Sequence, residues 1–258
     1  MAGHSKWANI KHKKAKEDVK RGKIFTKLIR EITVAARLGG DYKDANPRLR
    51  AAIATALANN MSKDTIERAV LKGDGGDESV NVEEVRYEGY GPGGVAIIVD
   101  CMTDNRNRTV SEIRHAFMKS GGNLGTDGSV AYMFTKRGII SFPPSVDEDT
   151  LMEVALEVGA EDIITHEDGS INVYTDPHDF SDIQEALIEK GFNSESAEVT
   201  FDAETKAELD IGTAEKVMAL IDKLEDLDDV QSVYSNANFT RELIEQLGEA
   251  FLFDYHYL

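Results

Sequence analysis

SKDTIERAVLKGDGGDESVNVEEVRYEGYGPGGVAIIVDC, residues 62–101, holds the change of pattern that decides the fold. Ser62 is a favoured N-cap residue, and it predicts a helix that ends before the glycine-rich linker GDGGDES, residues 73–79. Beyond this linker the pattern changes to two strands, Val85–Glu88 and Val95–Cys101, joined by a glycine-rich turn. The sequence therefore predicts a helical unit followed by α+β structure.

On the N-terminal side of this stretch, two more helices are predicted. The first runs from Lys23 and stops at Gly39-Gly40, because apolar residues recur in it at three- and four-residue spacing. Asn46-Pro47 predicts the N-cap and first residue of the second helix. Together with the helix that begins after Ser62, these form a three-helix unit.

On the C-terminal side, the predicted order from residue 138 to 201 is β-α-β-β-α-β, a ferredoxin-like unit. Ser129–Phe134 is predicted to be a strand before it, and a helix and a strand over 213–234 are predicted to rejoin the sheet that begins near residue 83. The predicted fold class is α+β with three domains: an N-terminal three-helix unit followed by two α+β (ferredoxin-like) domains, the last inserted into the middle one. The predicted boundaries are 1–73, 80–135 plus 212–236, 136–211, and a C-terminal tail over 237–258.

Charge is divided unevenly along the chain of 258 residues, whose net charge is −18. Residues 1–72 hold 17 Lys and Arg against 7 Asp and Glu, whereas residues 73–258 hold 12 against 40. A basic segment on an acidic body indicates nucleic-acid or membrane-surface binding by the basic part. The single cysteine, Cys101, and the absence of a long apolar run or secretory signal favour the cytoplasm and exclude a membrane-spanning protein.

The predicted contact surface is a cationic stripe. If residues 13–37 form one helix, lysines and arginines fall on one side and apolar residues on the other, so the cations can neutralise successive phosphates. Trp7 and His12 can stack on bases. The alternative is that the lysine face is only solvated and that Trp7 packs on the helices. The candidate nucleic-acid-binding residues are Lys6, Trp7, Lys11, His12, Lys13, Lys14, Lys16, Lys20, Arg21, Lys23, Lys27 and Arg30.

A secondary anion site is predicted where a helix begins near Arg108, with Arg106 and Arg114 beside it. The alternative, that these arginines pair with local Asp and Glu, stays open.

Signatures of catalysis are missing from the sequence. Gly89–Gly94 matches GxGxxG but leads into apolar, β-branched residues, so it predicts a hairpin rather than a dinucleotide site. The six histidines and the cysteine have no metal-ligand spacing, and no nucleophile–base set is evident. We therefore expect no enzyme activity, metal, cofactor or small-molecule substrate.

Several long motifs resemble the YebC family, which includes the mitochondrial translational activator of cytochrome c oxidase. They are MAGHSKWANIKHKKAKEDVKRGKIFTKLIREI (1–32), NPRLRAAIATALANNM (46–61), YEGYGPGGVAIIVDCMTDNRNRT (87–109), GGNLGTDGSVAYMF (121–134), GAEDI (159–163) and DDVQSVYSN (228–236). Gly3 to Trp7 and the lysines after it match the family pattern, whereas GEAFLFDYHYL (248–258) extends past its usual end.

This resemblance implies three domains around a negatively charged cavity and no catalytic residue. It implies a probable DNA-binding transcriptional regulator, or alternatively a translation factor that binds ribosomal RNA or the ribosome and relieves stalling. An enzyme or cation site in the acidic cavity is a further alternative. The expected partner is DNA or ribosomal RNA, and the expected oligomeric state is a monomer.

Overall fold

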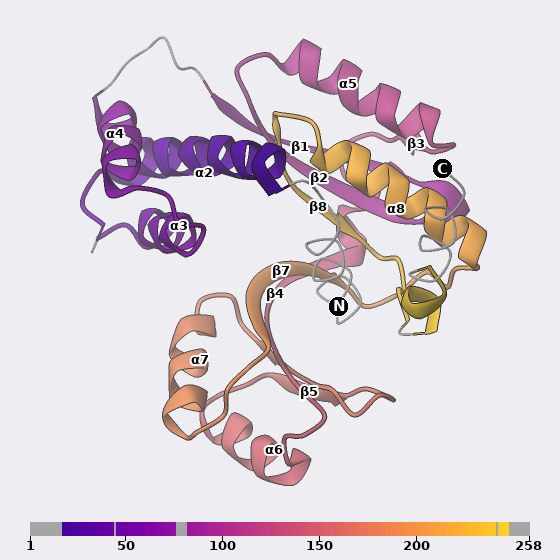
Figure 1. Cartoon of the computed structure of the whole chain (residues 1–258). Coiled ribbons are helices and arrows are strands. Elements are labelled where there is room, and N and C mark those ends of the chain that lie inside the picture. Colours follow the sequence, from indigo (N-terminus) through magenta and orange to yellow (C-terminus); the bar gives the residue numbers. More distant parts are fainter. Residues whose placement is uncertain (1–16, 44, 76–81, 241, 248–258) are drawn as a thin grey trace.

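The computed structural model describes residues 17–43, 45–75, 82–240 and 242–247. Figure 1 shows a helical domain beside a sheet that carries two helices, and a second sheet with its own two helices below them. The predicted α+β class with three domains is confirmed.

The helical domain consists of α2 (Glu17–Gly39), α3 (Pro47–Ala58) and α4 (Lys63–Asp74). The two predicted N-caps are confirmed, because Asn46 Oδ1 accepts a hydrogen bond from Leu49 N and Ser62 Oγ accepts one from Thr65 N. Helix α2 begins earlier than predicted and continues through Gly22. Gly73, predicted to follow the third helix, lies within α4.

The middle domain is a four-stranded sheet with the order β3-β1-β2-β8. Its elements are β1 (Glu83–Tyr90), β2 (Ala96–Thr103), α5 (Arg106–Lys119), β3 (Asn123–Leu124), α8 (Ile211–Glu225) and β8 (Val230–Ser235). The turn between β1 and β2 contains a short 3₁₀ helix, Pro92–Gly94, and leads directly into β2. The GxGxxG match is therefore a hairpin turn, as predicted.

The inserted domain is a second four-stranded sheet with the order β5-β6-β4-β7. Its elements are β4 (Phe134–Phe142), α6 (Glu148–Glu157), β5 (Asp162–Thr165), β6 (Ile171–Thr175), α7 (Phe180–Glu189) and β7 (Ser196–Ala203). This β-α-β-β-α-β order with all pairs antiparallel is ferredoxin-like. The middle domain was also predicted to be ferredoxin-like, but its strands are connected in a different order. The β1–β2 hairpin forms the centre of its sheet, and β3 and β8 add to its two sides.

The predicted strand Ser129–Phe134 is wrong. Residues Ala131–Met133 form a 3₁₀ turn, and β4 begins at Phe134. The buried Glu88 carboxylate accepts hydrogen bonds from the backbone N–H groups of Gly128, Val130 and Ala131 at 2.7–2.8 Å. These donors point to a side chain, so they cannot pair with a neighbouring strand.

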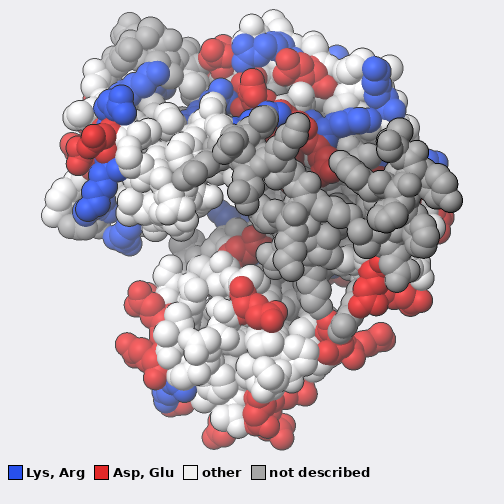
Figure 2. All heavy atoms as spheres, in the orientation of Figure 1, with Lys and Arg blue, Asp and Glu red and all other residues white. Residues whose placement is uncertain are grey.

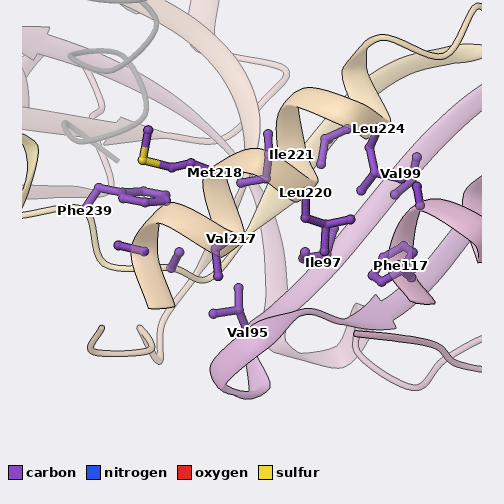
Figure 3. Close-up of a cluster of buried hydrophobic side chains, with 14 of the residues drawn as sticks. Val95, Ile97, Val99, Phe117, Val217, Met218, Leu220, Ile221, Leu224 and Phe239 are labelled. Atoms are coloured by element: carbon purple, nitrogen blue, oxygen red, sulfur yellow. The ribbon is translucent and has the colours of Figure 1, made fainter. Parts of the chain in front are cut away.

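The central strand β2 is buried on both faces. Ile97 and Val99 of β2 face α5 and α8, where Figure 3 shows Ile97 beside Leu220 and Val99 on the side of Phe117, and Val95, just before the strand, lies near Val217. The opposite face belongs to a cluster shared by the two sheets, made of Ala96, Ile98, Val130, Phe134 and Ala203. The middle and inserted domains therefore share apolar core.

The segment after β8 belongs to the middle domain. Phe239, Leu243, Ile244 and Leu247 are buried in the same cluster as α8, so the predicted tail over 237–258 is corrected for residues 237–247. Their apolar side chains complete the helix-covered face of the sheet. Residues 248–258 lie outside the described part of the chain.

Candidate nucleic-acid interface

The predicted contact residues divide into three groups. Lys6, Trp7, Lys11, His12, Lys13, Lys14 and Lys16 lie outside the described residues. Lys20 and Arg21 lie in α2, but their side chains are outside the description. The remaining three, Lys23, Lys27 and Arg30, are described, and all three contact the middle domain.

Lys23 and Lys27 bind the C-terminal end of α8. Lys23 Nζ lies 3.1 Å from both the backbone oxygen and the Oδ1 atom of Asp226, and Lys27 Nζ donates to the Glu225 oxygen at 2.9 Å. The last carbonyls of a helix have no partner within it and form the negative end of its dipole. Both lysines thus supply the cations that this helix end favours.

The helical and middle domains meet at a joint between α2 and residues 225–229. Arg30 lies deeper in this joint than the two lysines. Its NH1 atom donates to the backbone oxygens of Met102 and Asp228 at 2.7 and 3.0 Å and lies 3.1 Å from Asp229 Oδ1. The Arg30 side chain is 23% exposed and that of Asp229 is 3% exposed, so water screens this pair much less than a surface pair.

Asp229 is a buried anion that four side chains surround. Its Oδ2 atom accepts hydrogen bonds from Arg108, Thr109 and Thr103 at 2.7, 2.7 and 3.1 Å, while Oδ1 faces Arg30. Burial by itself would raise the pKa of Asp229, but the hydrogen bonds from Arg108, Thr109 and Thr103 outweigh it and hold the pKa below its ordinary value. The carboxylate is therefore charged and joins α2, β2, α5 and β8.

The predicted secondary anion site is occupied by the protein's own carboxylates. Arg108 NH2 lies 2.8 Å from Asp104 Oδ1 and 2.7 Å from Asp229 Oδ2, and Arg106 Nε lies 3.5 Å from Glu83 Oε2. Arg114 is exposed on α5 and makes no ion pair with the described residues. For Arg106 and Arg108 the structure favours the alternative, pairing with local acids.

Charged side chains are unevenly distributed over the surface. In the view of Figure 2, Lys and Arg gather over the helical domain, Lys and Arg are mixed with Asp and Glu in the α5 region of the middle domain, and Asp and Glu fringe the inserted domain. The inserted domain thus presents a mainly acidic outline on this face. A polyanion would be repelled by it and attracted to the helical domain.

Neither a metal-binding cluster nor a membrane-spanning helix is found among the described residues. There, no group of three or more His, Cys, Asp and Glu is arranged to hold a metal ion. Among the same residues, no helix combines the length and apolar character that crossing a membrane requires.

Two structural carboxylates were missed by reasoning from the sequence. Asp229 lies in an acidic turn and Glu88 lies in a strand, and neither belongs to a motif that marks it as a buried residue. Their burial, 2% and 5% exposed, follows from packing between distant segments. The available signal was positional, because Asp229 directly precedes a strand and Glu88 lies within one, and alternate side chains of a strand face the core.

The fold and the site define a class: a three-domain α+β protein in which a basic helical domain is joined through cations to an acidic two-sheet body. Residues 5–76 match the model of the TACO1/YebC protein N-terminal domain, and residues 82–237 match that of the TACO1/YebC second and third domain. The chain belongs to the TACO1/YebC family.

Similar proteins come from Francisella tularensis and Aquifex aeolicus. Proteins named probable transcriptional regulatory protein in Francisella tularensis subsp. tularensis (strain FSC 198) and subsp. novicida (strain U112) are 92% identical over 248 residues, 96% of this chain and 100% of each relative. The crystal structure of a conserved hypothetical protein from Aquifex aeolicus is 50% identical, with a TM-score of 0.76 over 90% of this chain and 96% of that one.

Proposed function

We propose that the protein is a non-enzymatic, DNA-binding regulator of transcription that acts in the cytoplasm through its basic N-terminal segment. The observation that carries the proposal is the segregation of charge, 17 Lys and Arg against 7 Asp and Glu in residues 1–72 on an otherwise acidic chain. The names of the relatives support a regulatory role.

The contact in this proposal rests first on the lysines that precede the described part of α2. Residues 1–16 contain five lysines and no Asp or Glu. In contrast, Lys23, Lys27 and Arg30 already have partners within the chain. A phosphate backbone that contacted these three residues would first have to break the pairs that they already make.

The test is a salt titration of duplex-DNA binding. In one variant Lys11, Lys13, Lys14 and Lys16 are replaced by Gln, and in a matched control Lys119, Lys136, Lys190 and Lys216 are replaced by Gln, with the same loss of charge. If the four N-terminal lysines meet phosphates, the slope of log K against log salt falls by about 3–4. An equal loss of affinity in both variants would place the contact elsewhere.

The same titration on structured ribosomal RNA tests the second function, a translation factor on the ribosome. A phosphate-reading surface by itself suits both polymers. Affinity for the RNA that exceeds affinity for the duplex at physiological salt would favour the ribosome over transcription.

A further inference from the structure

The two joints between domains have different physical character. The middle and inserted domains share an apolar cluster that includes Ile98, Phe134 and Ala203. The apolar core of the helical domain contains residues of that domain alone, among them Ile32, Leu49 and Ile66. Charge screening by salt weakens ionic contacts between domains but not apolar ones, and polar interfaces permit relative motion.

The helical domain is joined to the body by charged side chains. Lysine and arginine side chains donate hydrogen bonds across this joint: Lys23, Lys27 and Arg30 to the α8–β8 turn and β2, and Arg48 to Glu84 on β1. The acceptors include the carboxylates of Asp226, Asp229 and Glu84. The joint thus has the composition of a contact between a basic helix and a polyanion.

The acidic turn between α8 and β8, residues 225–229, occupies the cations that a phosphate backbone would also attract. It offers Lys23, Lys27 and Arg30 three backbone oxygens and two carboxylates. The outer pair is weak, because the Lys23 and Asp226 side chains are 40% and 73% exposed. The inner pair, Arg30 with Asp229, is well shielded from water.

We propose that the acidic α8–β8 turn is an internal competitor for nucleic acid on the cationic face of α2, so that a bound polyanion displaces the turn and releases the helical domain from the body. This inference rests on the proposed function for its ligand. It extends the contact from the N-terminal lysines to Lys23, Lys27 and Arg30 and adds its regulation: the apparent affinity of this extended site is the intrinsic affinity multiplied by the fraction of molecules that are open.

Domain release is measured by energy transfer between dyes on two introduced cysteines, Leu71→Cys on α4 and Met118→Cys on α5. Both native side chains are exposed, at 66% and 67%. The native Cys101 is buried, and burial together with nearby Asp229 and Asp100 raises its pKa to about 12, so it is scarcely labelled at neutral pH. The reference pair, Met118→Cys with Leu156→Cys, reports on the two domains that share apolar core.

The expected result is that duplex DNA, or heparin at constant ionic strength, changes transfer for the Leu71–Met118 pair and leaves the reference pair unchanged. Asp226→Asn and Asp229→Asn should each bind DNA several-fold more tightly than the wild type and open at lower salt. Glu215→Gln, an exposed position elsewhere on α8, is the control for the same change of net charge.

Failure of this inference is distinguishable from failure of the proposed function. Tight DNA binding with constant Leu71–Met118 transfer would overturn the competition and leave DNA binding intact. Opening by heparin without binding of DNA or RNA would support the competition and overturn the proposed function. A pair that responds to neither salt nor heparin would overturn the competition as well.

Discussion

Arg30 NH1 and Asp229 Oδ1 lie 3.1 Å apart, although the two residues are 199 positions apart in the sequence. The pair joins the basic helical domain to the acidic body at its most buried point. It shows that part of the predicted nucleic-acid stripe has a structural role within the chain.

Asp229→Ala should lower the free energy of unfolding by about 2–4 kcal/mol, because it leaves Arg30 and Arg108 facing each other without the buried carboxylate between them. Urea denaturation followed by circular dichroism measures the change. Asp226→Ala is the matched control, and since that side chain is 73% exposed its effect should stay within about 1 kcal/mol. Equal effects of the two variants would contradict the assigned role of Asp229.

Acid should destabilise the protein through Asp229 and Glu88. Burial opposes ionisation of Glu88, but the backbone N–H groups of Val130, Gly128 and Ala131 lower its pKa, as hydrogen bonds lower that of Asp229. A lowered folded-state pKa gives stability that is complete above the unfolded-state pKa, about 3.9 for Asp and 4.3 for Glu, and is lost as pH falls through the folded value.

The urea midpoint should therefore fall below about pH 4 in the wild type, and the fall should be shallower in Asp229→Asn and in Glu88→Gln. Glu215→Gln, at an exposed position, should follow the wild-type curve. Identical pH profiles for all four proteins would show that neither buried carboxylate controls acid stability.

Gly73→Ala should separate two helices of the helical domain. A Cβ atom at Gly73 would overlap the backbone oxygen of Thr33 and lie 2.8 Å from Ala36 Cβ, both on α2. The expected cost is about 1–3 kcal/mol, measured by thermal unfolding. Gly22→Ala is the counterpart, because a Cβ at Gly22 meets nothing within 4 Å, and it should stabilise α2 by about 0.5–1 kcal/mol.

A zero-length carbodiimide should couple Lys23 to Asp226, whose Nζ and Oδ1 atoms lie 3.1 Å apart across the joint. Mass spectrometry of the digested protein detects the product, and its yield should decrease as salt weakens the joint. Lys190 and Glu157, 3.5 Å apart within the inserted domain, are the internal reference. Formation of the reference product without the Lys23–Asp226 product at low salt would show that the joint is open in solution.

Most of the helices and strands could be predicted from the local sequence pattern. Asn46 and Ser62 mark helix starts because each side chain accepts a hydrogen bond from a backbone N–H three residues later. Such a short-range contact can be recognised in the sequence. The strand order of the middle sheet could not be predicted in this way, because it depends on which distant strands pair. The 3₁₀ turn at Ala131–Met133 could not be predicted either, because it depends on Glu88, which is more than 40 residues away.

The candidate site, too, could be predicted from the sequence only in part. The sequence by itself determined that cations are concentrated before residue 73, since charge segregation is a property of composition. Only the tertiary structure decided which cations have partners in the chain: Lys23, Lys27 and Arg30 pair with residues 225–229 because folding β8 beside β2 places that turn against α2. The periodicity of a helix shows which side chains share one of its faces. Which segment packs against that face depends on contacts between residues some 200 positions apart, and these cannot be read from the periodicity.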